Sequence, residues 1–152
     1  MIIIFVLRFS PHLLMTLQKQ LTVNTVRLSV MNSWRNWPLM RKSAKKILEI
    51  RQDEIRHFKV FSHIYTALTG RQPTPKIAEQ CPSEYRAGIN FAFKDEQETV
   101  DFFYLNIAGR TNDPFIKEHF QRASADEQNH AVWFFVLFLT QHSAVAHEPL
   151  IT

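Results

Sequence analysis

The sequence predicts an all-α protein, an antiparallel helix bundle whose first helix is atypical or degraded. Three observations lead to this prediction. Apolar residues recur at helical spacing from about residue 41 onward. Glycine is scarce, at 3 of 152 residues, and phenylalanine is abundant, at 13. Few turns and many aromatic side chains favour long helices over a β-sandwich, and a single domain of this length can bury a core.

The predicted core contains three helices, at residues 41–70, 83–108 and 113–141. The first helix ends at Gly70, because glycine is the residue best suited to a helix C-terminus. A connector with three prolines follows at 71–82. Asp113 is a good N-cap for the last helix, and Pro114 suits its first position. Residues 142–152 are expected to be a C-terminal tail.

Residues 1–40 are predicted to be an atypical basic segment. Residues 1–48 hold eight Lys or Arg and no acidic residue, and the rest of the chain holds ten basic and fourteen acidic residues. The net charge of +4 therefore comes from the N-terminal third. No Lys/Arg cluster recurs on one helical face, so we expect no nucleic-acid partner. Arg8 and Pro11 interrupt the opening apolar run well before the ~20 residues of a membrane span.

Other polar residues are given no chemical role. Cys81 is the single cysteine, which excludes a disulfide framework or a Cys-x-x-Cys metal site and favours a reducing, cytoplasmic setting. We interpret it as inert. Glu98 is expected to face solvent. The remaining histidines are interpreted as surface or packing residues: His63, His119, His142 and His147.

One motif, Asp-Glu-x-x-His, occurs twice and predicts a metal site. Its Glu and His are three residues apart and so share a helix face, and both pairs lie inside an apolar stripe: Glu54 with His57, and Glu127 with His130. Glu96 holds a similar position on the middle helix. Carboxylates within an apolar stripe are costly unless they are paired or bind a cation. This is the pattern of a dinuclear site in a helix bundle, and oxygen and imidazole ligands suit iron or manganese.

The first helix lacks the ligand that would complete this site. Glu96 precedes Glu127 by 31 residues, so a partner for Glu54 is expected near position 23, where residues 21–25 contain no acid. We therefore predict weak or mononuclear metal occupancy and low oxidase turnover. Asp53 and Asp126 point about 100° away from the neighbouring glutamates. Each either orients an imidazole on another helix or forms a surface salt bridge.

Between residues 47 and 138 the chain resembles the rubrerythrin and ferritin-like superfamily. The segments that carry the resemblance are 48–58, 65–70, 94–102 and 126–133. It implies a ferritin-like bundle in which the five predicted ligands hold two irons, or two manganese ions, and oxidise ferrous iron or reduce peroxide. Full rubrerythrins carry a four-cysteine rubredoxin-like module; with one cysteine, this chain would need a separate electron donor. The resemblance also implies a homodimer.

Two explanations for the unusual first helix stay open. The metal site has been lost while the scaffold remains, or residues before about Lys45 are out of frame. Trp34–Ser43 read one base out of phase can give an acidic segment typical of this family's first hairpin, and Lys45-Lys46 can be coded by a slippage-prone adenine run. Two other functions are also open. One is a helical interaction or scaffold protein without a working metal centre, and the other is a basic protein that binds membranes or nucleic acid through residues 1–48.

Overall fold

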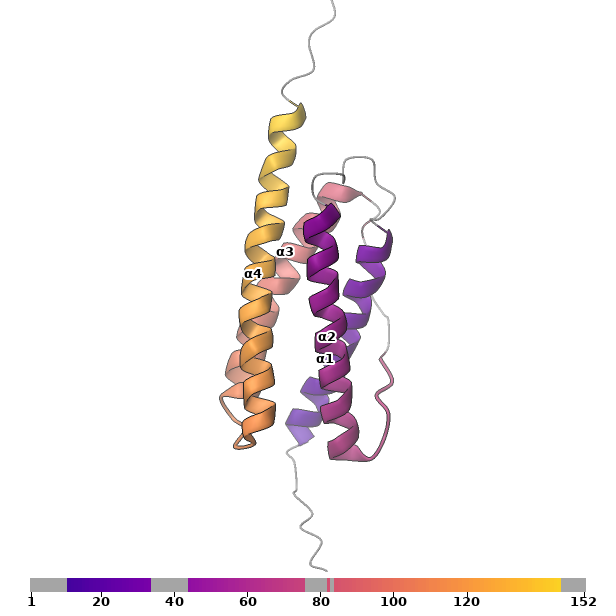
Figure 1. Ribbon diagram of the computed structural model, residues 1–152, viewed down its shortest axis with the longest axis vertical. Coiled ribbons are helices and arrows are strands. Elements are labelled where there is room, and N and C mark those ends of the chain that lie inside the picture. The colour runs from indigo at the N-terminus through magenta and orange to yellow at the C-terminus, as the bar shows by residue number, and fades with distance from the viewer. Residues whose placement is uncertain (1–10, 34–43, 76–81, 83, 146–152) are drawn as a thin grey trace, which may run out of the picture.

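A computed structural model describes residues 11–33, 44–75, 82 and 84–145. These residues form helices and no strand, as the sequence predicts. The helices are α1 (Pro11–Ser33), α2 (Ala44–Thr69), α3 (Tyr85–Phe103) and α4 (Pro114–Val145), and α3 continues as a π-helical segment, Tyr104–Ala108. In Figure 1, α1 lies beside α2 and α3 beside α4, so the chain forms two helical hairpins.

The structure corrects the expectation of a degraded first helix. Residues 11–33 form one continuous helix of 23 residues that packs against α2. Its buried face mixes apolar residues such as Leu17 and Leu21 with polar residues such as Asn24 and Arg27, which is why its sequence lacks a clear apolar stripe. The helix is thus atypical in composition, but it is continuous over the residues that the structure describes there.

The local signals at two helix ends have the expected geometry. Gly70 has a φ of 68° and its amide donates to the carbonyl of Thr66 at 2.8 Å, so the residue ends α2 in the left-handed conformation that favours glycine. At the start of α4, the Asp113 carboxylate accepts a hydrogen bond of 3.0 Å from the Ile116 amide. The last helix runs to Val145, four residues beyond the predicted end.

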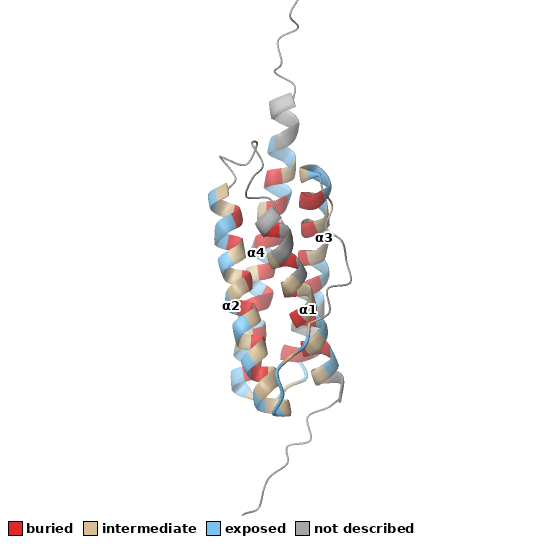
Figure 2. Ribbon diagram, turned by 90° about the vertical axis from the view of Figure 1, so that its right-hand side faces the viewer, coloured by how far each residue is buried: buried red, intermediate tan, exposed pale blue. Residues whose placement is uncertain are grey.

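The interior consists of two apolar clusters with a polar layer between them. One cluster includes Met31, Ile50, Ile89 and Phe134, and the other includes Leu21, Phe61, Ile107 and Phe120. Along every helix, the polar layer falls between a residue of one cluster and a residue of the other. Figure 2 shows that buried residues recur along the helices and face the inside of the bundle.

Each of the four helices gives the polar layer two buried residues that are three positions apart. The pairs are Asn24 and Arg27, Glu54 and His57, Glu96 and Thr99, and Glu127 and His130. Residues three apart lie on one helix face, so the four pairs face one another across the bundle. Helix packing alone therefore gathers charged side chains from all four helices into one dry volume.

Candidate metal centre

Four of the predicted ligands lie close enough together to hold one metal ion. Glu54, Glu96, Glu127 and His130 each offer a donor atom, and these atoms all lie within 4.8 Å of one another. All four residues are buried, with 0–1% of their surface exposed. His57 is not part of this group of four, but its Nδ1 lies 3.3 Å from Glu127 Oε1. The structure thus brings all five predicted side chains into one cluster.

Six buried atoms of these five residues form no hydrogen bond, although each lies 3.2–3.8 Å from an oppositely charged group of the cluster. They are Glu54 Oε1, His57 Nδ1, both Glu96 carboxylate oxygens, Glu127 Oε1 and His130 Nδ1. Buried polar atoms are almost always hydrogen-bonded, because leaving one unpaired costs about 1–3 kcal/mol. The unpaired atoms are carboxylate oxygens and imidazole nitrogens, which are the donors that transition metals bind. The cluster therefore fits a metal ion.

The two aspartates of the repeated motif contact the histidines across the bundle. Asp126 Oδ2 lies 3.2 Å from His57 Nε2, and Asp53 Oδ2 lies 3.2 Å from His130 Nε2. Each aspartate thus contacts an imidazole on the other helix, because α2 and α4 run antiparallel. Arg56 links the same two aspartates at the surface, with contacts of 2.6 and 2.7 Å. Both predicted roles of these aspartates are thus present, because each one contacts a histidine and also forms a salt bridge with Arg56.

Arg27 contributes a cation that the sequence analysis does not anticipate. Its Nη1 lies 2.7 Å from Glu127 Oε2, 3.2 Å from Glu96 Oε2 and 3.4 Å from Glu54 Oε2. The side chain is 4% exposed, and its Nε donates to Asp95 Oδ2 at 2.6 Å. A positive charge from α1 therefore lies where the predicted site lacks a carboxylate.

Asn24 is the second residue that sequence reasoning misses. Its Nδ2 donates to Glu54 Oε2 at 2.9 Å, and its Oδ1 accepts from Gln20 Nε2 at 2.9 Å. Asn24 lies next to position 23, where the spacing of the glutamates predicts a partner for Glu54. One feature of the sequence could have identified Asn24 and Arg27. They are three residues apart, as are Glu54 and His57 on α2.

The contacts within this cluster favour the charged form of both histidines. Burial opposes this charge, but the hydrogen bond to Asp126 and contacts with Glu127 and Glu54 raise the pKa of His57 to about 11. Burial likewise opposes the charge of His130, and contacts with Glu127 and Glu54 raise its pKa to about 9. For Asp126, burial raises the pKa, but the contacts with His57 and with surface arginines outweigh this effect and lower the pKa to about 2.

The three buried glutamates differ in whether their surroundings favour the neutral or the ionised carboxyl group. Burial raises the pKa of Glu96 well above its usual range, although the charge of Arg27 opposes this shift. Burial also favours the neutral form of Glu127, but Arg27 and the contact with Glu96 lower its pKa well below its usual range. For Glu54, burial and the charge of Glu127 raise the pKa, and Arg27 and the two histidines bring it below its usual value. Arg27 thus helps to keep two of three buried carboxylates ionised.

The other candidate residues lie away from this cluster. His63 and His119 contact the ring of Phe115, with centroid distances of 6.4 and 4.3 Å. Glu98 is exposed on α3. Cys81 and His147 lie outside the described residues, as does the side chain of His142.

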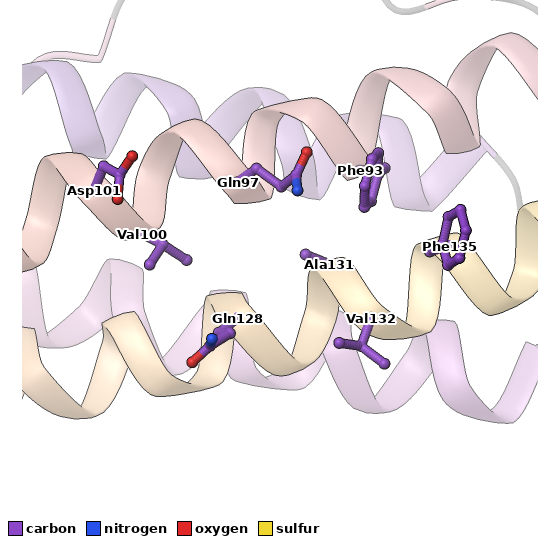
Figure 3. A pocket seen from close by; sticks show the side chains of 8 residues that line it. All are labelled: Phe93, Gln97, Val100, Asp101, Gln128, Ala131, Val132 and Phe135. Carbon is purple, nitrogen blue, oxygen red and sulfur yellow. The ribbon is translucent and has the colours of Figure 1, made fainter.

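An open groove with a volume of about 470 Å³ lies between α3 and α4, separate from the polar cluster. Figure 3 shows Phe93, Gln97 and Val100 of α3 facing Gln128 and Phe135 of α4 across it. No predicted ligand lines the groove. It is therefore a surface feature of the α3–α4 hairpin rather than part of the candidate metal centre.

The fold and the site define a helical protein with a buried carboxylate–imidazole cluster that can hold a metal ion. The chain is 54% identical over 90 residues to the uncharacterized protein YhjR of Bacillus subtilis (strain 168), a match that covers 59% of this chain and 61% of the relative. No family model matches the chain, and no solved structure gives a significant match. None of the helices in the described ranges is both long and apolar enough to cross a membrane.

Proposed function

We propose that this protein binds a divalent transition metal, iron or manganese, in the polar layer of the bundle. Glu54, Glu96, Glu127 and His130 are the proposed ligands, with His57 beside them as a fifth donor. The observation that carries the proposal is the convergence of these buried side chains, four of which offer donor atoms within 4.8 Å of one another. The unpaired oxygen and nitrogen atoms among them supply the donor types that iron and manganese bind.

The resemblance to rubrerythrins and ferritin-like proteins extends this proposal to redox chemistry. A bound iron or manganese centre would accept electrons from ferrous iron or from a separate donor and would supply electrons to dioxygen or peroxide. The protein would exclude bulk water, since the proposed ligands are buried. Asp53 and Asp126 would hold the two imidazoles through their Nε2 atoms, leaving each Nδ1 directed at the cluster. Electrons would come from a separate donor.

Metal analysis of protein purified without chelator tests the proposal. We expect wild-type protein to bind one iron or manganese per chain and not two, and we expect loss of that metal in Glu127→Gln, which keeps the side-chain volume. Glu98→Gln is the matched control, because Glu98 is an exposed glutamate outside the cluster. Wild-type protein without metal after exposure to both ions, or equal metal content in Glu127→Gln, would contradict metal binding at this site.

The contacts of Arg27 favour a second candidate, a helical scaffold or interaction protein without a working metal centre. A guanidinium that contacts three carboxylates can neutralise them in part, so the fold does not require a metal for that purpose. Glu127→Gln separates the two functions. A scaffold would show no loss of metal, and its stability would change only through the altered charge balance around Arg27.

The third candidate, binding to a polyanion through residues 1–48, gains no support from the described part of that segment. Arg27 is buried among carboxylates. Lys46 pairs with Glu49 and lies over the ring of Trp133. Two of the eight basic residues are thus already engaged within the protein. A steep salt dependence of binding to a polyanion would revive this candidate.

We also propose that two copies of the chain associate through α4. Residues 131–140 contain no charged side chain, and four of their apolar residues are exposed: Val132, Phe135, Val136 and Leu139. A helix that is apolar on all sides is usually buried. Val132 and Phe135 also line the groove between α3 and α4, so the same surface offers a partner an apolar recess.

A further inference from the structure

We infer that Arg27 acts as a built-in cation that competes with metal for the carboxylates of this cluster. This inference rests on the proposed metal-binding function and adds a residue that limits it. The competing charge is part of the chain, so it is always present at the site. Arg27 would therefore set how tightly the cluster binds metal and would stabilise the bundle in the metal-free state.

The first observation is the position of one nitrogen atom. Arg27 Nη1 contacts one oxygen, Oε2, from each of Glu54, Glu96 and Glu127, at distances of 2.7–3.4 Å. These glutamates come from three different helices and are three of the four residues that can hold a metal ion. A cation that bridges carboxylates of several helices is the role that the metal plays in a carboxylate-rich bundle.

The second observation concerns the two oxygens of Glu54 and of Glu127, which contact different partners. Glu127 Oε1 lies 3.3 Å from His57 Nδ1, and Glu54 Oε1 lies 3.4 Å from His130 Nδ1. Neither Oε1 atom has a hydrogen-bond partner. The Oε2 atoms thus face the guanidinium, and the Oε1 atoms face the imidazoles. A metal ion on the imidazole side would share both carboxylates with Arg27, and a second ion would need the place of Nη1.

The third observation is that the guanidinium is anchored away from the carboxylate cluster. Its Nη2 donates to Thr99 Oγ1 at 2.7 Å and to the Asp95 carbonyl at 3.2 Å, and its Nε donates to Asp95 Oδ2 at 2.6 Å. Arginine cannot lose its proton at ordinary pH, so its charge persists when metal arrives. A bound divalent ion and the guanidinium would repel each other at close range in a poorly screened interior.

Mn²⁺ titration of wild type and Arg27→Met tests this competition. Methionine is unbranched and apolar, so the variant removes the guanidinium while filling part of its space. We expect Arg27→Met to bind Mn²⁺ at least about tenfold more tightly than wild type, because a cation that contacts the same three carboxylates repels a bound metal ion. Lys19→Met, which removes an exposed positive charge from the same helix, should leave the affinity unchanged.

Thermal unfolding gives a readout that does not depend on activity. Without metal, Arg27→Met should have a lower Tm than wild type, because its buried carboxylates lose their cation. Added Mn²⁺ should raise the Tm of Arg27→Met by more than that of wild type. If Arg27→Met folds only with Mn²⁺, that result also supports the competition. Should it fold under neither condition, Arg27→Gln, which removes the charge but keeps a hydrogen-bonding side chain, is expected to bind Mn²⁺ more tightly than wild type.

Coincident Mn²⁺ curves for wild type and Arg27→Met, or weaker binding by the variant, would overturn the competition. If Arg27→Gln is needed, Mn²⁺ binding by that variant that is no tighter than in wild type would also overturn the competition. Glu127→Gln separates this failure from failure of the proposed function. If wild type binds Mn²⁺ and Glu127→Gln does not, the metal site stands and only the role of Arg27 is wrong. If neither wild type nor Arg27→Met binds Mn²⁺ or Fe²⁺, the proposed function is wrong and the competition falls with it.

Discussion

The contact between Asp53 and His130 leads to a prediction about metal affinity. Asp53 Oδ2 lies 3.2 Å from His130 Nε2, and His130 Nδ1 is the unpaired nitrogen that faces the carboxylates. An aspartate in this position fixes the ring orientation and raises the basicity of the nitrogen that binds metal. Asp53→Ala removes this acceptor and leaves every proposed ligand in the sequence.

The expected loss of metal affinity is about 10- to 100-fold, or about 1.4–2.7 kcal/mol of binding free energy. The loss of stability should be smaller. Asp53 is 31% exposed and also pairs with Arg56 at the surface. An exposed pair of this kind contributes up to about 1 kcal/mol. Asp126→Ala should have a smaller effect on affinity, because its partner His57 lies outside the group of four donors.

Mn²⁺ titration and thermal unfolding of the metal-free protein measure these two quantities separately. Glu49→Ala is the matched control, since Glu49 is an exposed carboxylate on the same helix that pairs with Lys46. Its Mn²⁺ affinity should equal that of wild type. If Asp53→Ala binds Mn²⁺ as tightly as wild type does, then His130 needs no orienting carboxylate and the reasoning from this contact is wrong.

Three further predictions concern the core, the oligomer and the gene. Phe120→Ala should lower the free energy of unfolding by about 3–5 kcal/mol in denaturant titrations, because Phe120 is fully buried and stacks on Phe61 at 4.5 Å, whereas exposed Phe115→Ala should cost much less. Light scattering should give a dimer for wild type and a monomer for Phe135→Glu; a monomeric wild type would contradict association through α4. Resequencing of the gene decides between the two explanations of the first helix: a shifted frame before about Lys45 would support the second one, and native peptides spanning residues 20–45 would rule it out.

The acidic helices could be predicted from sequence because their buried faces follow a strong rule. Apolar residues recur every three or four positions, and the few polar residues within that stripe are the ones that need a partner. Glu54, Glu96 and Glu127 are therefore recognisable without a structure. Their helices place them by spacing alone, and the antiparallel arrangement of α2 and α4 then brings Asp53 to His130.

The first helix could not be predicted in this way because its buried face breaks that rule. Gln20, Asn24 and Arg27 lie on the same face as Leu17 and Leu21, so apolar periodicity gives little signal. A search for carboxylates also overlooks Arg27, which has the opposite charge. The signal becomes visible only when the positions of the polar residues are compared among helices, because Asn24 and Arg27 have the spacing of a ligand pair.

The two explanations of the first helix differ in what they imply about Arg27. If the site has been altered while the scaffold remains, Arg27 belongs to the native protein and replaces a cation that the carboxylates no longer bind tightly. If residues before about Lys45 are out of frame, the native chain lacks Arg27, and the family resemblance implies a glutamate on its first helix. The native protein would then hold more metal than the chain as written. If the two reading frames differ, a comparison of the Mn²⁺ bound per chain by the two proteins tests the role of Arg27, since equal amounts would show that Arg27 does not limit the site.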